Sequence, residues 1–168
     1  LGRNIGNALE VKEAIDFFNG KYDKRLYDLC VYLSALMIST AKKISFKKAK
    51  DLTLNLIQNG HGKNKFYQWI KNQGGDITKL KVSEKAKVIR SNASGIIKNI
   101  DALKIGMLSA ALGSSAMKQG DIIDHGVGVV LHKKKGDTVN YGDALCTIYI
   151  GEEEYYPNPL EAFEIEII

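Results

Sequence analysis

The sequence predicts an α+β fold, in which a run of helices is followed by a compact lobe with a sandwich-like sheet. Apolar residues recur at helical spacing in successive stretches up to about residue 72, and these stretches are bounded by capping residues or glycines. Beyond residue 84 the apolar stretches become short and β-branched and are separated by turn residues. The polar, aperiodic segment 76–84 is therefore the predicted boundary between two parts, residues 1–82 and 83–168.

The first helix is predicted to begin at Asn7, a residue type that caps helix N-termini well. Glu10 follows three residues later, where its carboxylate can reach back to the free amides of the first turn. Apolar residues at helical spacing continue to Phe18, and Gly20 provides a stop. Residues 3–5, which lie between two glycines, are predicted to form a loop.

Three more helices are predicted before the boundary. Residues 24–42 carry a continuous apolar stripe and form the second. Ser45 caps the third, which ends at Asn59-Gly60. A fourth, shorter helix contains Phe66 and Trp69 and ends at the glycine pair 74–75.

The second part is predicted to be mostly strand. Residues 85–91 and 95–100 resemble the two arms of a hairpin around residues 92–94. Asp101 can cap a helix that continues to about Leu112, and residues 113–120 form a loop. Strands are predicted at 125–133 and 144–150, and the final residues fit either helix or strand.

Composition limits the possible functions. The 168 residues carry a net charge of +5 and 45% hydrophobic residues, which is ordinary for a globular chain. No apolar run approaches the roughly 20 residues of a membrane span, and no signal-peptide pattern is present. The two cysteines form no metal-binding or disulfide pattern. We expect a reduced, cytoplasmic protein with no membrane partner.

The first half is basic. Residues 1–82 contain 15 Lys and Arg against 7 Asp and Glu. The lysines fall mostly on the polar faces of the predicted helices, and no basic stripe is interleaved with aromatic residues. We therefore expect no nucleic-acid partner.

No catalytic constellation is evident from spacing. The three histidines, His61, His125 and His132, lack ligand spacing and are interpreted as structural or surface residues. The Ser114-Ser115 pair has no partner base in the sequence. Asp121 and Asp124 are interpreted as loop-capping residues. No catalytic residue and no cofactor-binding residue is assigned.

One alternative is a non-enzymatic carrier or binding module. Biotin carrier domains present their modified lysine in an Ala-Met-Lys turn, which here would be residues 116–118 with Lys118 as the lysine. The later Gly-Asp pairs also resemble hairpins of the biotinyl/lipoyl fold. The matching upstream β half is missing, because residues 101–112 are predicted to be helical.

Three ordered blocks carry a second resemblance. They are GNALEVKEA at 6–14, QGGD at 73–76, and a series from Leu112-Gly113 through DIIDHGVG at 121–128 and KKGDTV at 134–139 to GD at 142–143. Together they resemble the C-terminal portion of the pyrimidine-nucleoside phosphorylases, a family that includes thymidine phosphorylase. The resemblance implies helices from the family's α/β domain, followed by its C-terminal domain with an α/β-hammerhead sheet.

The resemblance also implies an activity for the longer parent protein. Family members transfer the pentose of a thymidine- or uridine-type nucleoside to phosphate, and the parent is expected to be a homodimer. The family's phosphate loop and base-binding residues lie before the point where this sequence begins. We therefore expect this chain to be an inactive fragment that exposes apolar surface and self-associates over residues 8–42. The family's Ala-Gly-Arg is replaced by Ser114-Ser115-Ala116, so the arginine is absent.

A monovalent cation, usually potassium, is the remaining implication of the resemblance. By position, its ligands would include the backbone carbonyls of Leu1 and Asn4 and the carboxylate of Glu13. Carbonyls and a carboxylate suit a hard, weakly charged cation. The alternative is that Glu13 is an ordinary exposed helix residue. Because the other ligands lie outside this sequence, we expect the site to be empty here.

Overall fold

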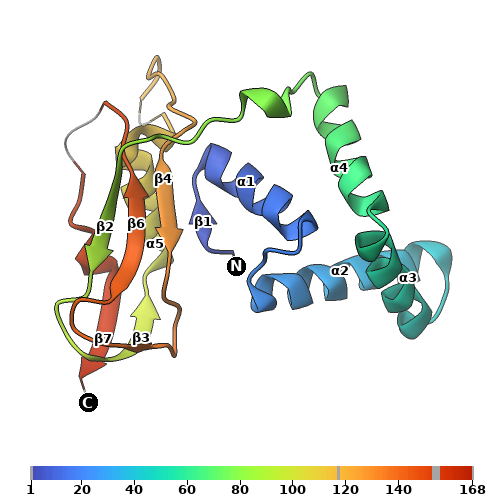
Figure 1. Cartoon of the computed structure of the whole chain (residues 1–168), viewed down its shortest axis with the longest axis horizontal. Helices are drawn as coiled ribbons and strands as arrows, with labels where there is room; N and C mark the ends of the chain where they lie inside the picture. The colour runs from blue at the N-terminus through green and yellow to red at the C-terminus, as the bar shows by residue number, and fades with distance from the viewer. Residues whose placement is uncertain (1, 117, 153–155, 168) are drawn as a thin grey trace. The chain divides into compact units, whose positions relative to one another are not determined.

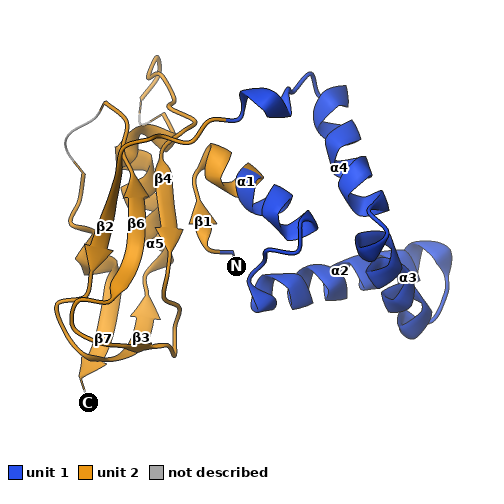
Figure 2. Cartoon of the chain, viewed as in Figure 1, with its two compact units in different colours: residues 1–2, 12–80 blue, residues 3–11, 81–168 orange. Residues whose placement is uncertain are grey.

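The computed structural model describes residues 2–116, 118–152 and 156–167. The chain divides into two compact units, and each is described by itself. Unit 1 comprises residues 1–2 and 12–80, and unit 2 comprises residues 3–11 and 81–168 (Figure 2). Helices are followed by two small antiparallel sheets with a helix (Figure 1), so the predicted α+β class is confirmed.

Unit 1 is helical. It contains the later part of α1 (Asn7–Phe18), then α2 (Lys24–Lys42), α3 (Phe46–Gln58), α4 (His61–Asn72) and the 3₁₀ turn η1 (Ile77–Lys79). Ser45 caps α3 as predicted, because its side chain accepts a hydrogen bond from the Lys48 amide. The four predicted helices are therefore confirmed. They could be predicted because helix caps and stops are local signals in the sequence.

Small side chains allow α2 and α3 to pack closely. Val31 and Ala35 of α2 and Ala49 and Thr53 of α3 are all buried. The Thr53 hydroxyl donates to the Ala49 carbonyl oxygen, so its burial leaves no unpaired polar group. This contact leaves the opposite side of α2 outside the core of unit 1.

Unit 2 contains a four-stranded and a three-stranded sheet. The first has the strand order β1-β4-β6-β2, formed by Asn4–Ile5, Gly128–Leu131, Ala144–Tyr149 and Ala86–Arg90. The second has the order β5-β3-β7, formed by Thr138–Val139, Gly95–Ile100 and Phe163–Ile167. All pairings are antiparallel.

The predicted hairpin between residues 85–91 and 95–100 is wrong. Both segments are strands, but β2 pairs with β6 and β3 pairs with β5 and β7. The cause lies at the buried Ser91, whose amide donates to the Asp143 carbonyl oxygen while its own carbonyl accepts from the Gly142 amide. These bonds hold the end of β2 against a distant turn, and the chain passes on into the other sheet.

The predicted loop at residues 3–5 is also corrected, because Asn4–Ile5 forms the edge strand β1 on β4. A strand of two residues carries no periodicity, so its pairing is set by the partner strand rather than by its own sequence.

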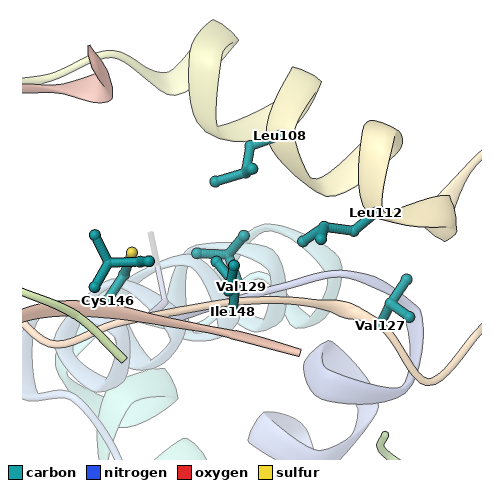
Figure 3. Close-up of a cluster of buried hydrophobic side chains, with 7 residues drawn as sticks. Leu108, Leu112, Val127, Val129, Cys146 and Ile148 are labelled. Atoms are coloured by element: carbon teal, nitrogen blue, oxygen red, sulfur yellow. The ribbon is translucent and has the colours of Figure 1, made fainter. Parts of the chain in front are cut away.

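A helix covers the core of the larger sheet. α5 (Ala102–Ser109) continues into a π-helical turn, η2 (Ala110–Ser114), and Asp101 caps α5 as predicted. Leu108 and Leu112 point from this helix toward Val129 and Ile148 of the sheet (Figure 3). The C-terminal segment contains both alternatives left open by its sequence: the 3₁₀ turn η3 (Pro159–Ala162) leads into β7.

Among the described residues, no single helix is long and apolar enough to cross a membrane. Only the bent pair of α2 and α3 passes that test together, by length and composition.

Candidate functional site

The site predicted from the sequence begins at the seam between β1 and β4. The Leu131 amide donates to the Arg3 carbonyl oxygen at 2.7 Å, and Asn4 lies opposite Val130 in the antiparallel ladder. Hydrogen-bonding direction alternates along such a ladder. The peptide groups of Asn4 therefore point away from β4, and its carbonyl is not used in the pairing.

Two glycines allow the seam to close. Gly6 has a φ of +125°, and a Cβ added there would lie 2.6 Å from the Val127 carbonyl oxygen. Gly128 has a φ of +150°, and its Cβ would lie 2.2 Å from the Ile5 carbonyl oxygen. A side chain at either position would force the backbones apart.

Polar side chains then fix the start of α1. Asn4 Nδ2 donates to the Leu9 carbonyl oxygen at 2.9 Å. Glu10 Oε1 accepts from the Gly6 amide at 3.2 Å, which confirms that the carboxylate reaches back to the start of the helix. Asn7 is not the cap that was predicted: it lies within α1, and its Nδ2 donates to the Ser114 carbonyl oxygen at 2.8 Å.

Ser114 occupies part of the segment where the expected arginine is absent. Its hydroxyl lies 2.8 Å from the hydroxyl of Ser109, and its carbonyl oxygen accepts a hydrogen bond from the Asn7 side chain. A neutral hydrogen-bonded pair therefore fastens the π-helical turn to α5 and to the start of α1. Sequence reasoning missed this role, because no local pattern links residues 107 positions apart.

Glu13 belongs to unit 1 and is half-buried. Its carboxylate lies directly against Gly2, since a Cβ added to Gly2 would fall 1.8 Å from Glu13 Oε2. Burial, and secondarily the charge of Glu13, raises the pKa of the Cys30 thiol. The Glu13 carboxylate thus lies against Gly2 and close enough to Cys30 of α2 to influence its thiol.

The three predicted cation ligands lie in different parts of the chain. Leu1 lies outside the described residues, Asn4 belongs to unit 2 and Glu13 belongs to unit 1. In the described ranges there is no group of three or more His, Cys, Asp or Glu residues that could hold a metal ion. The available donors, an outward-facing carbonyl and one carboxylate, fit a monovalent hard cation better than a transition metal. The potassium site stays a prediction.

Two turns with the same construction join the strands near β5. In residues 134–137, the Asp137 amide donates to the Lys134 carbonyl and the Asp137 carboxylate accepts from the Lys134 amide at 2.8 Å. Residues 140–143 repeat both bonds between Asp143 and Asn140. The glycine before each aspartate has a positive φ, of 90° and 85°. The Gly-Asp pairs of the sequence are therefore turn-forming elements.

A third turn of this construction contains the lysine of the carrier alternative. Asp121 accepts from the Lys118 amide at 2.9 Å and donates back to the Lys118 carbonyl, with Gly120 at a φ of 95°. Met117 lies outside the described residues. Lys118 follows the helical turn η2 and does not sit on a turn between two paired strands, as a carrier lysine would.

Both candidate carboxylates of residues 121–124 have structural bonds, in agreement with their interpretation as loop-capping residues. Asp124 accepts from the Gly126 amide at 2.8 Å, and its own amide donates to the Gly113 carbonyl oxygen. These bonds hold the segment that enters β4.

Asp143 also forms an ion pair with Lys133 at 2.9 Å. The amide of Asn140 and then the Lys133 ammonium hold the pKa of the Asp143 carboxyl below its ordinary value. Lys133 additionally donates to the Thr138 carbonyl oxygen, so the ion pair ties β5 to the neighbouring turn.

The histidines have structural or surface positions. His132 Nε2 lies 2.7 Å from the Thr147 hydroxyl, and Arg3 donates to the His132 carbonyl oxygen at 2.8 Å. Burial, with the nearby Arg3 charge, lowers the pKa of His132. His61 and His125 are exposed. None of the three belongs to a possible metal cluster within the described part of the chain.

Comparison with known proteins identifies the family. Residues 96–167 match the model of the pyrimidine nucleoside phosphorylase C-terminal domain. Over 160 residues, or 91% of the chain, the sequence is 38% identical to a pyrimidine-nucleoside phosphorylase of Staphylococcus haemolyticus (strain JCSC1435). Over 92% of the chain, the sequence is 37% identical to the protein of the same name from Staphylococcus aureus (strain USA300). The chain spans 37% of the length of each of these relatives. The chain belongs to the pyrimidine nucleoside phosphorylase family, and its residues 96–167 correspond to the C-terminal domain of that family.

Proposed function

We propose that this chain forms the C-terminal part of a pyrimidine-nucleoside phosphorylase. The complete enzyme would cleave thymidine- or uridine-type nucleosides with phosphate, giving the free base and a pentose 1-phosphate. The observation that carries the proposal is the match to enzymes of that name along 91% of this chain. The match to the C-terminal domain supports the position of the chain within the enzyme.

The proposed reaction has defined chemical requirements. Phosphate oxygen forms a bond to the anomeric carbon of the sugar while the bond from that carbon to the pyrimidine nitrogen breaks. Cationic groups and amides must hold the phosphate, and a donor must neutralise charge on the departing base. The carboxylates of Asp121, Asp124, Asp137 and Asp143 instead bond backbone amides in turns. We propose that the chain alone does not catalyse phosphorolysis.

In this proposal the chain supplies structural support for a site completed by other parts of the enzyme. The glycine seam between β1 and β4 fixes the start of α1, and the Asn7–Ser114 bond joins α1 to η2. The proposed homodimer and the nucleoside and phosphate substrates belong to the complete enzyme.

The test is a chimera in which this chain replaces the matched region of the S. haemolyticus relative. Release of thymine or uracil from nucleoside is followed by absorbance, with and without phosphate. We expect phosphate-dependent release by the chimera and none by this chain alone. Phosphate-dependent release by the isolated chain would contradict its proposed inactivity. A folded chimera that releases no base, beside an active S. haemolyticus control, would contradict the proposed function.

A potassium ion is the second part of the proposal, with the Asn4 carbonyl and the Glu13 carboxylate among its ligands. The ion would supply positive charge that holds the start of α1 in place. The outward direction of the Asn4 carbonyl at the edge of the sheet is the feature that supports it.

A further inference from the structure

α2 carries apolar residues on the side that is buried in unit 1 and also on the side that is not. Residues 29–41 contain no charged side chain. One side of this stretch, with Val31 and Ala35, is buried at the contact with α3. A helix without charge around its whole circumference is typical of a helix that is covered on all sides.

The opposite side of α2 is exposed. Met37 is 65% exposed, Tyr32 53%, and Leu33 and Leu36 are each 45% exposed. The spacing of these four residues, i, i+1, i+4 and i+5, places them together on one helical face. We call these four residues the α2 face. Phe46 of α3, also exposed, extends it, because its ring lies 5.4 Å from that of Tyr32.

We propose that the α2 face packs against the part of a phosphorylase polypeptide that precedes the region matched by this chain. The inference rests on the proposed function. The relatives match over 91–92% of this chain, so α2 corresponds to a segment within them, yet the chain spans only 37% of their length. Since residues 96–167 match the C-terminal domain, the additional polypeptide lies largely before the matched region.

The chemistry of the face defines the surface that would cover it. The nearest charged residues along α2 are Asp28 and Lys42, at either end of the uncharged stretch. The covering surface is therefore expected to be apolar at its centre, with charged groups only at its rim. Leaving a contiguous apolar face in water is unfavourable, and burying these large side chains favours the assembly.

A thiol placed in the α2 face measures whether it is covered. Leu36→Cys is introduced into the isolated chain and into the S. haemolyticus chimera, and its reaction with a maleimide is followed by peptide mass spectrometry. We expect at least tenfold slower labelling of position 36 in the chimera. Fragmentation of the labelled peptide distinguishes position 36 from the half-buried Cys30, and Cys146 is fully buried.

Lys50→Cys is the matched control. Lys50 is exposed on α3 beside the charged residues Lys47 and Lys48, so its labelling rate should be equal in the two proteins. Equal rates at both positions in a chimera that unfolds cooperatively would overturn the proposal. Slow labelling of position 36 in a chimera without phosphorylase activity would support this inference while contradicting the proposed function.

Two other occupants are distinguished by the isolated chain. Protection of position 36 in the isolated chain that increases with protein concentration, with no protection in the chimera, would assign the face to a second copy and overturn the proposal. Protection caused by phosphatidylglycerol vesicles, with no protection in the chimera, would assign the face to a lipid surface and also overturn it.

Discussion

Asn7 Nδ2 and the Ser114 carbonyl oxygen lie 2.8 Å apart and join the first helix to the π-helical turn after α5, across 107 positions of sequence. Ser114 is held in turn by the hydroxyl of Ser109. The bond thus connects α1 to the helix that covers the core of unit 2.

Removing this bond should destabilise unit 2. Asn7→Ala is expected to lower the free energy of unfolding by about 1 kcal/mol, because the Ser114 carbonyl loses its partner. Urea unfolding followed by circular dichroism measures the change. Asn64→Ala is the control, since Asn64 is an exposed residue of α4 and should change stability by less than about 0.5 kcal/mol. Equal effects of the two variants would contradict the assigned role of Asn7.

Glycines of unit 2 should respond to alanine with opposite signs. Gly128→Ala places a Cβ against the Ile5 carbonyl oxygen, and we expect a loss of about 2 kcal/mol or more from strain and separation of β1 from β4. Gly106→Ala faces open space within α5, and helix propensity predicts a gain of about 0.5–1 kcal/mol. Thermal unfolding of both variants checks the pair, and a neutral Gly128→Ala would rule out the tight seam.

Asp143 should make stability sensitive to acid. Its pKa is lowered in the folded chain by the Asn140 amide and by Lys133, so the ionised carboxylate stabilises the fold at pH 7. This stabilisation is lost as the pH falls through the lowered native pKa, below about pH 4. Asp143→Ala should therefore be less stable than the wild type at pH 7, and the difference should shrink at pH 3. Asp51→Ala, an exposed change on α3, should show no such pH-dependent difference in urea midpoints.

Cys146 should be unreactive in the folded chain. The residue is fully buried, and burial raises the pKa of its thiol to about 12. A thiol reagent at pH 8 should therefore modify Cys146 only after unfolding, because the thiolate is the reacting species. Mass spectrometry of a Cys30→Ser variant with and without urea isolates this residue. Rapid native modification would place Cys146 outside the core.

Glu13 should influence potassium binding if the proposed site forms in the complete enzyme. In the S. haemolyticus chimera, potassium is expected to raise the melting temperature more than the larger tetramethylammonium ion, through linkage between binding and folding. Glu13→Gln should reduce that difference, because one anionic ligand is lost. Glu161→Gln, an exposed change near β7, is the control. An unchanged potassium effect in Glu13→Gln would exclude its carboxylate as a ligand.

Local signals allowed much of the fold to be predicted. Ser45 and Asp101 were recognised as caps because the bond from a cap side chain spans only two or three residues. The Gly-Asp pairs lie between the strands predicted at 125–133 and 144–150, and each of their turns closes within four residues. Such features are contained in a short window of sequence and need no tertiary partner.

The errors occurred where the partner was distant. The segment 92–94 has the composition of a hairpin turn, but the bonds of Ser91 to residues 142 and 143 direct its flanking strands into different sheets. Asn7 is a residue type that often caps helices, yet its side chain donates a hydrogen bond to the Ser114 carbonyl oxygen. For the cation site, Asn4 and Glu13 could be named only by resemblance, since a carbonyl ligand leaves no mark in side-chain identity.

The pairing of β1 with β4 also has a consequence for the order in which the chain can fold during synthesis. Ile5 is made before its partner Val129, which leaves the ribosome only after residues 12–80 of unit 1 have been translated. The helices can therefore form while the seam of unit 2 is still open, and closing it requires a contact of high sequence separation, which is slow. A nascent chain halted before residue 128 would contain the helices of unit 1 in full, but β1 would still lack its partner strand β4.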